Sequence, residues 1–151
     1  MVAISAGGAH TCGLTAQGVV YCWGSNAFGQ LGRASTDPAP SGSAIQVAGA
    51  YKAISAGATT TCAITTGGAA SCWGKNDYGQ LGNGSVGGSS NAPVATSGGR
   101  TDFTAITVGA RHSCAVGTSG AYCWGSNVLG ALGNELQAMI QPIPTKTATP
   151  Q

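Results

Sequence analysis

The stretch "CWGSNAFGQLG" occupies residues 22–32, and two close copies follow it, "CWGKNDYGQLG" at 72–82 and "CWGSNVLGALG" at 123–133. The residues before each copy repeat as well, since "AISAGGAHTCGLT" at 3–15 has a counterpart ahead of the second and third copies. The copies are about fifty residues apart. A repeat of this period indicates one supersecondary unit that occurs three times and stacks on its own copies.

The composition limits the class of protein. A chain of 151 residues ordinarily forms one domain, and its 26 glycines suit short strands and turns better than helices. Six Lys or Arg and four Asp or Glu give a net charge of +2, with the basic residues scattered singly. Nucleic acids and anionic membranes require clustered cations, and a membrane-spanning helix requires about 20 apolar residues in a row. We therefore expect neither a nucleic-acid partner nor a membrane span.

Each unit contains four predicted strands. In the first unit "VAISAG", "HTCGLT" and "VVYCWG" supply three, and a fourth is expected at 44–47, 92–96 and 141–145 in the successive units. Prolines in the last two segments favour edge positions. Four short antiparallel strands per unit are typical of a propeller blade. The sequence predicts an all-β fold of three four-stranded blades, as an incomplete ring or part of a larger propeller, with repeats at about 2–50, 51–102 and 103–145 and a Thr/Pro tail at 146–151.

The hairpin in each unit has a predictable register. If Thr15 lies opposite Val19, a three-residue loop ends at Gly18, which must adopt φ > 0. The same register places Cys12 directly opposite Cys22. The second unit repeats this spacing, whereas the third is one residue shorter and requires another loop type.

The six cysteines fit one disulfide in each blade. Opposed Cα atoms of an antiparallel pair lie about 4.5–5.5 Å apart, within the range that a disulfide accepts. Zinc would require pairs two to four residues apart, and buried free thiols are the main remaining alternative. Three disulfides would indicate an oxidising compartment, so we expect an extracellular or cell-surface location, with the periplasm as a further option. The expected pairs are Cys12 with Cys22, Cys62 with Cys72, and Cys114 with Cys123.

The repeat resembles a known family. The pattern His-Thr/Ser-x-x-Leu, then Gly-x-Val-Tyr-x-Trp-Gly-x-Asn-x-x-Gly-Gln-Leu-Gly, runs from His10 to Gly32 and is similar to the regulator of chromosome condensation repeat. The resemblance covers essentially the whole chain and departs at Thr60, which replaces His, and at Ala131, which replaces Gln. It implies a β-propeller, most often of seven blades, here of a disulfide-containing secreted type.

The quoted stretch is expected to form the corner where each blade contacts the next. Trp and Leu would fill the space between blades, glycines would allow close approach or φ > 0, and Asn would hydrogen-bond its local backbone. A phosphate-binding loop would need a helix to follow, and none is predicted. The blade-packing residues are Trp23, Gly24, Asn26, Gly29, Leu31, Gly32, Trp73, Gly74, Asn76, Gly79, Leu81, Gly82, Trp124, Gly125, Asn127, Gly130, Leu132 and Gly133.

No catalytic constellation is recognised. His10 and His112 occupy equivalent positions, which favours a structural hydrogen bond over catalysis, and the four acids lie in unrelated contexts. We therefore predict no enzyme activity, metal or cofactor. Binding is expected in the connections at 33–43, 83–91 and 134–140, which differ most between units, although they are equally explained as tolerated surface loops. The candidate binding residues are Asp37, Pro38, Ser89, Ser90, Asn91 and Glu135.

The sequence thus favours a non-catalytic extracellular module for protein interaction or structure, with a protein or glycan partner. The alternatives are a secreted enzyme inhibitor on the same fold and a guanine nucleotide exchange regulator, an activity that the resemblance implies for nuclear and cytosolic members but that no residue here supports. Three blades do not close a ring. We therefore expect the chain either to continue in a longer protein or to pair with a second copy. Residues 1–8 lack the features of a signal peptide, so either a signal has been removed or the chain is a piece of a longer one.

Overall fold

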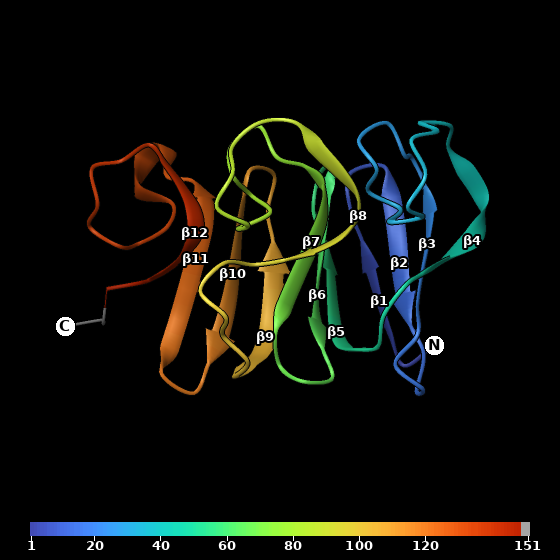
Figure 1. Cartoon of the computed structure of the whole chain (residues 1–151), viewed down its shortest axis with the longest axis horizontal. Helices are drawn as coiled ribbons and strands as arrows, with labels where there is room; N and C mark the ends of the chain where they lie inside the picture. The colour runs from blue at the N-terminus through green and yellow to red at the C-terminus, as the bar shows by residue number, and fades with distance from the viewer. Residues whose placement is uncertain (149–151) are drawn as a thin grey trace.

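Three four-stranded antiparallel sheets stand side by side in the computed structural model, which describes residues 1–148 (Figure 1). The last residues of the expected Thr/Pro tail, 149–151, lie outside the described part. Blade 1 contains β1 (Ala3–Ala6), β2 (His10–Leu14), β3 (Val20–Gly24) and β4 (Ser41–Val47). Blade 2 contains β5 (Tyr51–Ala56), β6 (Thr60–Thr65), β7 (Ala70–Lys75) and β8 (Ser89–Ala95). Blade 3 contains β9 (Phe103–Val108), β10 (His112–Gly117), β11 (Gly120–Ser126) and β12 (Ile140–Lys146), with the short 3-10 helix η1 (Val128–Gly130).

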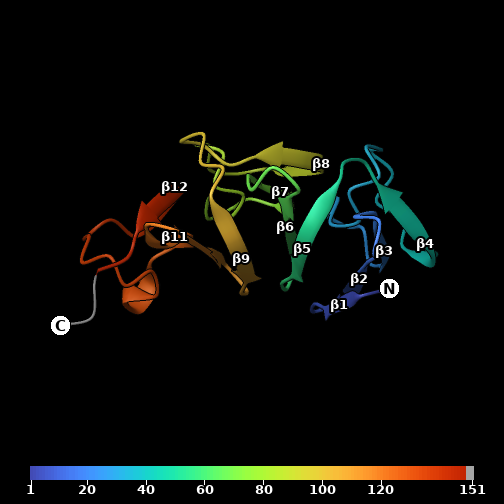
Figure 2. The same cartoon turned by 90° about the horizontal axis from the view of Figure 1, so that it is seen from below.

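The strands of each blade are hydrogen-bonded in chain order, and the blades fan out from one side (Figure 2). The first strands β1, β5 and β9 lie on the inner side of the arc, and the last strands β4, β8 and β12 lie on its outer side. This arrangement confirms the predicted all-β fold of propeller blades.

The hairpin between β2 and β3 has the predicted register. The amide of Thr15 donates to the carbonyl of Val19 at 2.9 Å, and Gly18 closes the three-residue loop at φ 81°. Gly68 repeats this geometry at φ 87° in blade 2. In blade 3, Gly117 pairs directly with Gly120, so the loop there has only two residues and is of a different type, as expected.

The fourth strands are the outermost strands of their sheets, so their prolines lie at an edge. They begin earlier than predicted. The sequence predicts a loop at Ser89, Ser90 and Asn91, but these are the first three residues of β8. Ser90 pairs with Gly74 of β7, and Ser89 pairs with Lys75. A register shift between Cys72 and Gly74 allows pairing to resume past the proline in this strand, which the linear pattern does not reveal.

Each blade has one disulfide that joins its second and third strands, which confirms the predicted pairing. The bonds join Cys12 to Cys22, Cys62 to Cys72 and Cys114 to Cys123, with Cα–Cα distances of 4.1, 4.0 and 4.1 Å. All six cysteines are paired in these three bonds. In the chain-entropy account, a short loop of this kind contributes about 2–3 kcal/mol to stability.

The hydrophobic core lies between blades. One buried cluster combines Cys12, Leu14, Val20, Cys22 and Leu31 of blade 1 with Tyr51, Ala63 and Trp73 of blade 2. A second cluster joins blades 2 and 3 in the same way. A single four-stranded sheet has no other element to cover its faces, so each blade depends on its neighbours for burial.

Candidate functional site

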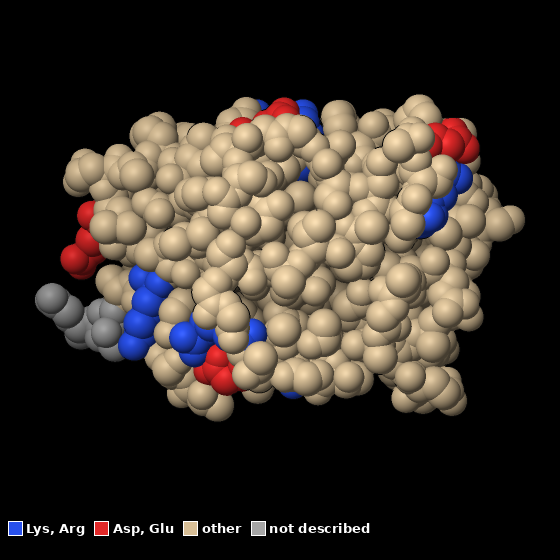
Figure 3. All heavy atoms as spheres, in the orientation of Figure 1, with Lys and Arg blue, Asp and Glu red and all other residues tan. Residues whose placement is uncertain are grey.

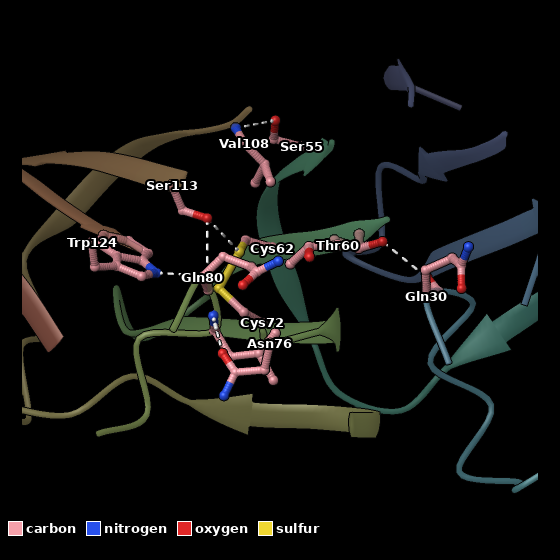
Figure 4. Close-up of a disulfide and its surroundings, with 12 residues drawn as sticks. Gln30, Ser55, Thr60, Cys62, Cys72, Asn76, Gln80, Val108, Ser113 and Trp124 are labelled. Carbon is pink, nitrogen blue, oxygen red and sulfur yellow. Dashed lines mark hydrogen bonds between the residues drawn. A yellow bond between two sulfur atoms is a disulfide. The ribbon is translucent and has the colours of Figure 1, made fainter. Parts of the chain in front are cut away.

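Each junction between blades is organised by a tryptophan. The indole Nε1 of Trp73 donates to the carbonyl of Gln30 in the preceding blade at 2.9 Å. Trp124 donates to the carbonyl of Gln80 at the same distance, as Figure 4 shows. Both indoles are completely buried. A Cβ added at Gly32 would lie 2.8 Å from Nε1 of Trp73. Gly32 and Gly82, the last glycines of the first two quoted stretches, therefore make room for the tryptophan of the next blade.

The same carbonyl accepts a second bond from the next blade. The hydroxyl of Thr61 donates to the Gln30 carbonyl at 2.9 Å, and Ser113 donates to the Gln80 carbonyl at 3.0 Å. The Gln30 carbonyl thus uses both lone pairs at the junction. The sequence did not reveal this role, because the bond involves the backbone of the glutamine and not its side chain.

His10 completes the first junction. Its Nε2 lies 2.8 Å from Oγ1 of Thr61, and that hydroxyl already donates to a carbonyl, so the imidazole must donate. Burial lowers the pKa of His10 to about 4, which keeps the ring neutral. His10 therefore links two blades. In blade 2 the equivalent Thr60 instead donates to the carbonyl of Lys75 within its own sheet, at 2.9 Å.

The motif asparagines connect the corner to the following loop. Oδ1 of Asn26 accepts from the amide of Leu31 at 3.1 Å, and Nδ2 donates to the carbonyl of Asp37 at 2.7 Å. Asn76 and Asn127 make the same two kinds of bond in their own blades. Each loop is therefore anchored to the blade core by one buried amide, whatever its sequence.

The glutamine side chain shapes the corner, and its loss changes blade 3. Oε1 of Gln30 accepts from the amide of Phe28 at 2.8 Å, and Gln80 repeats this bond in blade 2. Ala131 cannot make it. The corner there becomes η1, in which Leu129 adopts φ 60° with its side chain fully exposed. The sequence showed the replacement but not its structural effect.

The loops β3–β4, β7–β8 and β11–β12 lie together along the upper edge in Figure 1. We call this surface, residues 25–40, 76–88 and 127–139, the loop edge. Antiparallel pairing requires this arrangement, because the tight hairpins between second and third strands occupy the opposite edge. The segments that differ most between repeats are thus collected on one side of the molecule.

The structure brings together some of the candidate binding residues. Asp37 shapes the first loop, since its Oδ1 accepts from the amide of Ala39 at 2.9 Å and its Oδ2 lies 3.1 Å from Arg33. Pro38 follows it on the exposed surface. The carbonyl of Asn91 accepts from the amide of Ala34 at 2.8 Å, which joins β8 to this loop.

The other candidates are placed separately. Ser89 is exposed at the start of β8, and the hydroxyl of Ser90 donates to the carbonyl of Ala92 at 2.7 Å. Glu135 lies in the third loop at φ 58°, beside an open hollow of about 350 Å³. Amides, one carboxylate and apolar side chains line this hollow: Asn127, Leu129, Asn134, Glu135, Leu136 and Met139. Such a lining can hold a peptide or sugar but offers no acid–base pair.

The molecule presents little charge. In Figure 3 the charged side chains lie at the margins of a largely uncharged face. Three ion pairs neutralise most of the acids: Arg33 with Asp37, Lys75 with Asp77, and Arg100 with Asp102. Within the described residues, no helix is long and apolar enough to cross a membrane, and no group of His, Cys, Asp or Glu has the arrangement of a metal site.

Comparison with known proteins identifies the repeat. Two sequence patterns described as the regulator of chromosome condensation (RCC1) repeat match, one at residues 1–30, 51–80 and 103–131 and the other at 17–64 and 68–116. No match is found among curated protein sequences.

Several solved structures share the fold. Yeast RCC1 (Prp20), solved bound to Kap60, superposes with a TM-score of 0.84 and 23% identity over 97% of this chain. Human WBSCR16 gives a TM-score of 0.82 and 22% identity over 95% of the chain. The ectodomain of the receptor kinase CR4 from Physcomitrella patens gives 0.53 and 23% over 82%. The chain spans 37% of the first two proteins and 31% of the third. At these identities the likeness establishes the fold.

The repeat patterns match more than half of the chain and agree with its three four-stranded sheets, and the chain belongs to the regulator of chromosome condensation (RCC1) repeat family.

Proposed function

We propose that this chain is a non-catalytic module that binds a protein or glycan through its loop edge, in an extracellular, cell-surface or periplasmic setting. One observation carries the proposal. The three loops are anchored by the same asparagine bond in every blade, yet they differ in sequence, and the first is longer than the other two. A constant scaffold with variable loops is the usual arrangement of a binding surface.

The proposed setting follows from the cysteines. All six form disulfides within blades, and disulfides of this kind persist in oxidising compartments. The CR4 neighbour is an ectodomain, so this fold does occur outside cells. Counting thiols in freshly isolated protein tests the setting. Because most of the cysteines are buried, the count is made on denatured protein. We expect none before reduction and six after it, and six reactive thiols before reduction would refute the proposed setting.

The proposed partner class follows from the chemistry of the loop edge. Its segments are rich in Gly and Asn, and its few charges are largely paired, so recognition would depend on hydrogen bonds and shape. Yeast RCC1 was solved bound to a protein, Kap60, which agrees with a protein partner for this chain.

Binding can be tested with loop variants. Glycan arrays and displayed extracellular proteins would be probed with the wild type, with Asp37→Ala and with Glu135→Ala. Gln17→Ala, on an exposed hairpin at the opposite edge, is the matched control. We expect a ligand whose binding falls in at least one loop variant and is unchanged in the control. A ligand lost equally in the control would place the binding surface elsewhere.

The same material tests two other functions. Tight inhibition of a secreted hydrolase would make the module an enzyme inhibitor. Stimulated release of GDP from a small GTPase would make it an exchange regulator. We expect neither effect, because no residue of the loop edge matches a requirement specific to either activity.

A further inference from the structure

The two ends of the blade row are uncovered, and they are complementary. The end before β1, which we call the leading face, consists of Met1, Ile4, Thr11 and Trp23. The end after blade 3, which we call the trailing face, consists of Thr107, Cys114, Val116, Ala121, Ala131 and Gly133. Each residue corresponds by repeat position to a residue that is covered at the two junctions inside the chain.

Ile4 is an apolar side chain on the leading face that packs against no other blade. Its counterparts Ile54 and Ile106 are partly buried and pack against the core clusters that they share with the preceding blade. Ile4 is 68% exposed, because no blade precedes it in the structure. Met1 beside it is 65% exposed and corresponds to the buried aromatic residues Tyr51 and Phe103.

The trailing face has an apolar groove at the position where an isoleucine packs at the two junctions inside the chain. An open apolar groove of about 130 Å³ is lined by Thr107, Cys114, Val116 and Ala121, among others. On the equivalent surface of blade 2, Cys62, Ile64 and Ala70 are completely buried in the cluster that Ile106 packs against, whereas Val116, the counterpart of Ile64, is 49% exposed. The groove therefore stands where the next isoleucine would pack.

The polar groups of the two faces also match. Trp23 and Thr11 are only partly buried, whereas their counterparts Trp73 and Thr61 are completely buried and donate to the Gln30 carbonyl. The corresponding carbonyl on the trailing face belongs to Ala131.

The seat for a tryptophan is also present. Gly133 has φ 59°, close to the 67° of Gly32, but an added Cβ at Gly133 would meet nothing within 4 Å.

The His112 ring lies against the glycine three residues before it, as the His10 ring does in blade 1. A Cβ added at Gly109 would lie 3.0 Å from Cε1 of His112, and one at Gly7 would lie 2.8 Å from Cε1 of His10.

We infer that a second copy of this chain docks head to tail, with the leading face of one copy on the trailing face of the other. Ile4 enters the groove beside Val116, and the Trp23 ring packs on Gly133. The indole Nε1 of Trp23 and the hydroxyl of Thr11 donate to the Ala131 carbonyl. The Nε2 of His112 donates to the hydroxyl of Thr11. A second copy fits these two faces because the chain already makes the same junction twice between its own repeats.

The interface is heterologous, so two different patches meet, and the assembly closes into a ring or grows as an arc. It uses the blade ends and, of the loop edge, covers only the corner with Ala131 and Gly133, so Asp37 and Glu135 stay outside the two docking faces. The inference does not rest on the proposed binding function, and either can fail without the other.

The first test is sedimentation velocity of the oxidised chain from micromolar to millimolar concentration. We expect concentration-dependent association. Ile4→Arg and Val116→Arg should each weaken it at least about 100-fold, because an unpaired charge would enter an apolar seat. Val86→Arg, at a 51% exposed position on the loop edge, should associate like the wild type. Far-UV circular dichroism checks that each variant is folded, as expected for changes at exposed positions. A wild type that stays monomeric throughout would overturn the inference.

The second test distinguishes head-to-tail docking from any symmetric pairing. The Ile4→Arg chain keeps an intact trailing face, and the Val116→Arg chain keeps an intact leading face. Mixing the two should restore a dimer, although neither variant associates alone. Failure of the mixture to form a dimer, or association of Ile4→Arg equal to that of the wild type, would refute the assignment of the two faces.

Discussion

Replacing Gly32 by alanine tests the junction between blades. Gly32 has φ 67°, where a side chain costs about 1–2 kcal/mol. The new Cβ would also lie 2.8 Å from Nε1 and 3.1 Å from Cδ1 of Trp73, so the buried ring must shift. Such overpacking costs about 1–3 kcal/mol, and weakening the bond from the indole to the Gln30 carbonyl adds about 1 kcal/mol. We expect Gly32→Ala to lower the free energy of unfolding by about 3–6 kcal/mol.

Gly133→Ala is the matched control. Its φ of 59° imposes a similar backbone cost, but no atom lies within 4 Å of the added Cβ. We expect a loss of only about 1–2 kcal/mol in the monomer, so the two variants should differ by about 2–4 kcal/mol.

The assay is urea unfolding of the oxidised protein, followed by circular dichroism at a concentration at which the chain is monomeric. Equal losses for Gly32→Ala and Gly133→Ala would refute the reasoning, because the backbone cost would then explain both and the tryptophan would add nothing. The control has a second use: in concentrated solution, Gly133→Ala should weaken association through the trailing face.

Three further predictions concern single features of the blades. In the folded state burial lowers the pKa of His10 to about 4, whereas in the unfolded chain the pKa of this histidine is 6.5. The free energy of unfolding should therefore fall by about 3 kcal/mol as the pH drops from 6.5 to 4. His10→Gln should flatten this part of a pH–stability profile, and an unchanged profile would contradict the assignment. Ala131→Gln should restore the side-chain bond to the corner amide and raise stability by about 1 kcal/mol in urea unfolding, and a loss of stability would show that the corner of blade 3 has adapted to alanine. The paired change of Cys62 and Cys72 to alanine should cost about 2–3 kcal/mol in thermal unfolding, and a cost near zero would show that the sheet holds this hairpin without its crosslink.

Local features of this fold were predictable because they depend on neighbouring residues in one hairpin. The loop ending at Gly18 sets the register, and the register alone places Cys12 opposite Cys22. The start of β8 was not predicted, because it depends on a register shift opposite Gly74. The candidate binding residues were chosen from sequence differences, and the structure separates Glu135 from the group around Asp37.

The sequence by itself determined the repeat, the blade and its disulfide, since turn geometry and strand pairing act within about a dozen residues. Only the tertiary structure decided which carbonyl receives each tryptophan, why His10 is neutral, and which two faces remain uncovered. The physical reason is distance along the chain. These features arise when surfaces about fifty residues apart are buried against each other, and burial is a property of the packed blades together.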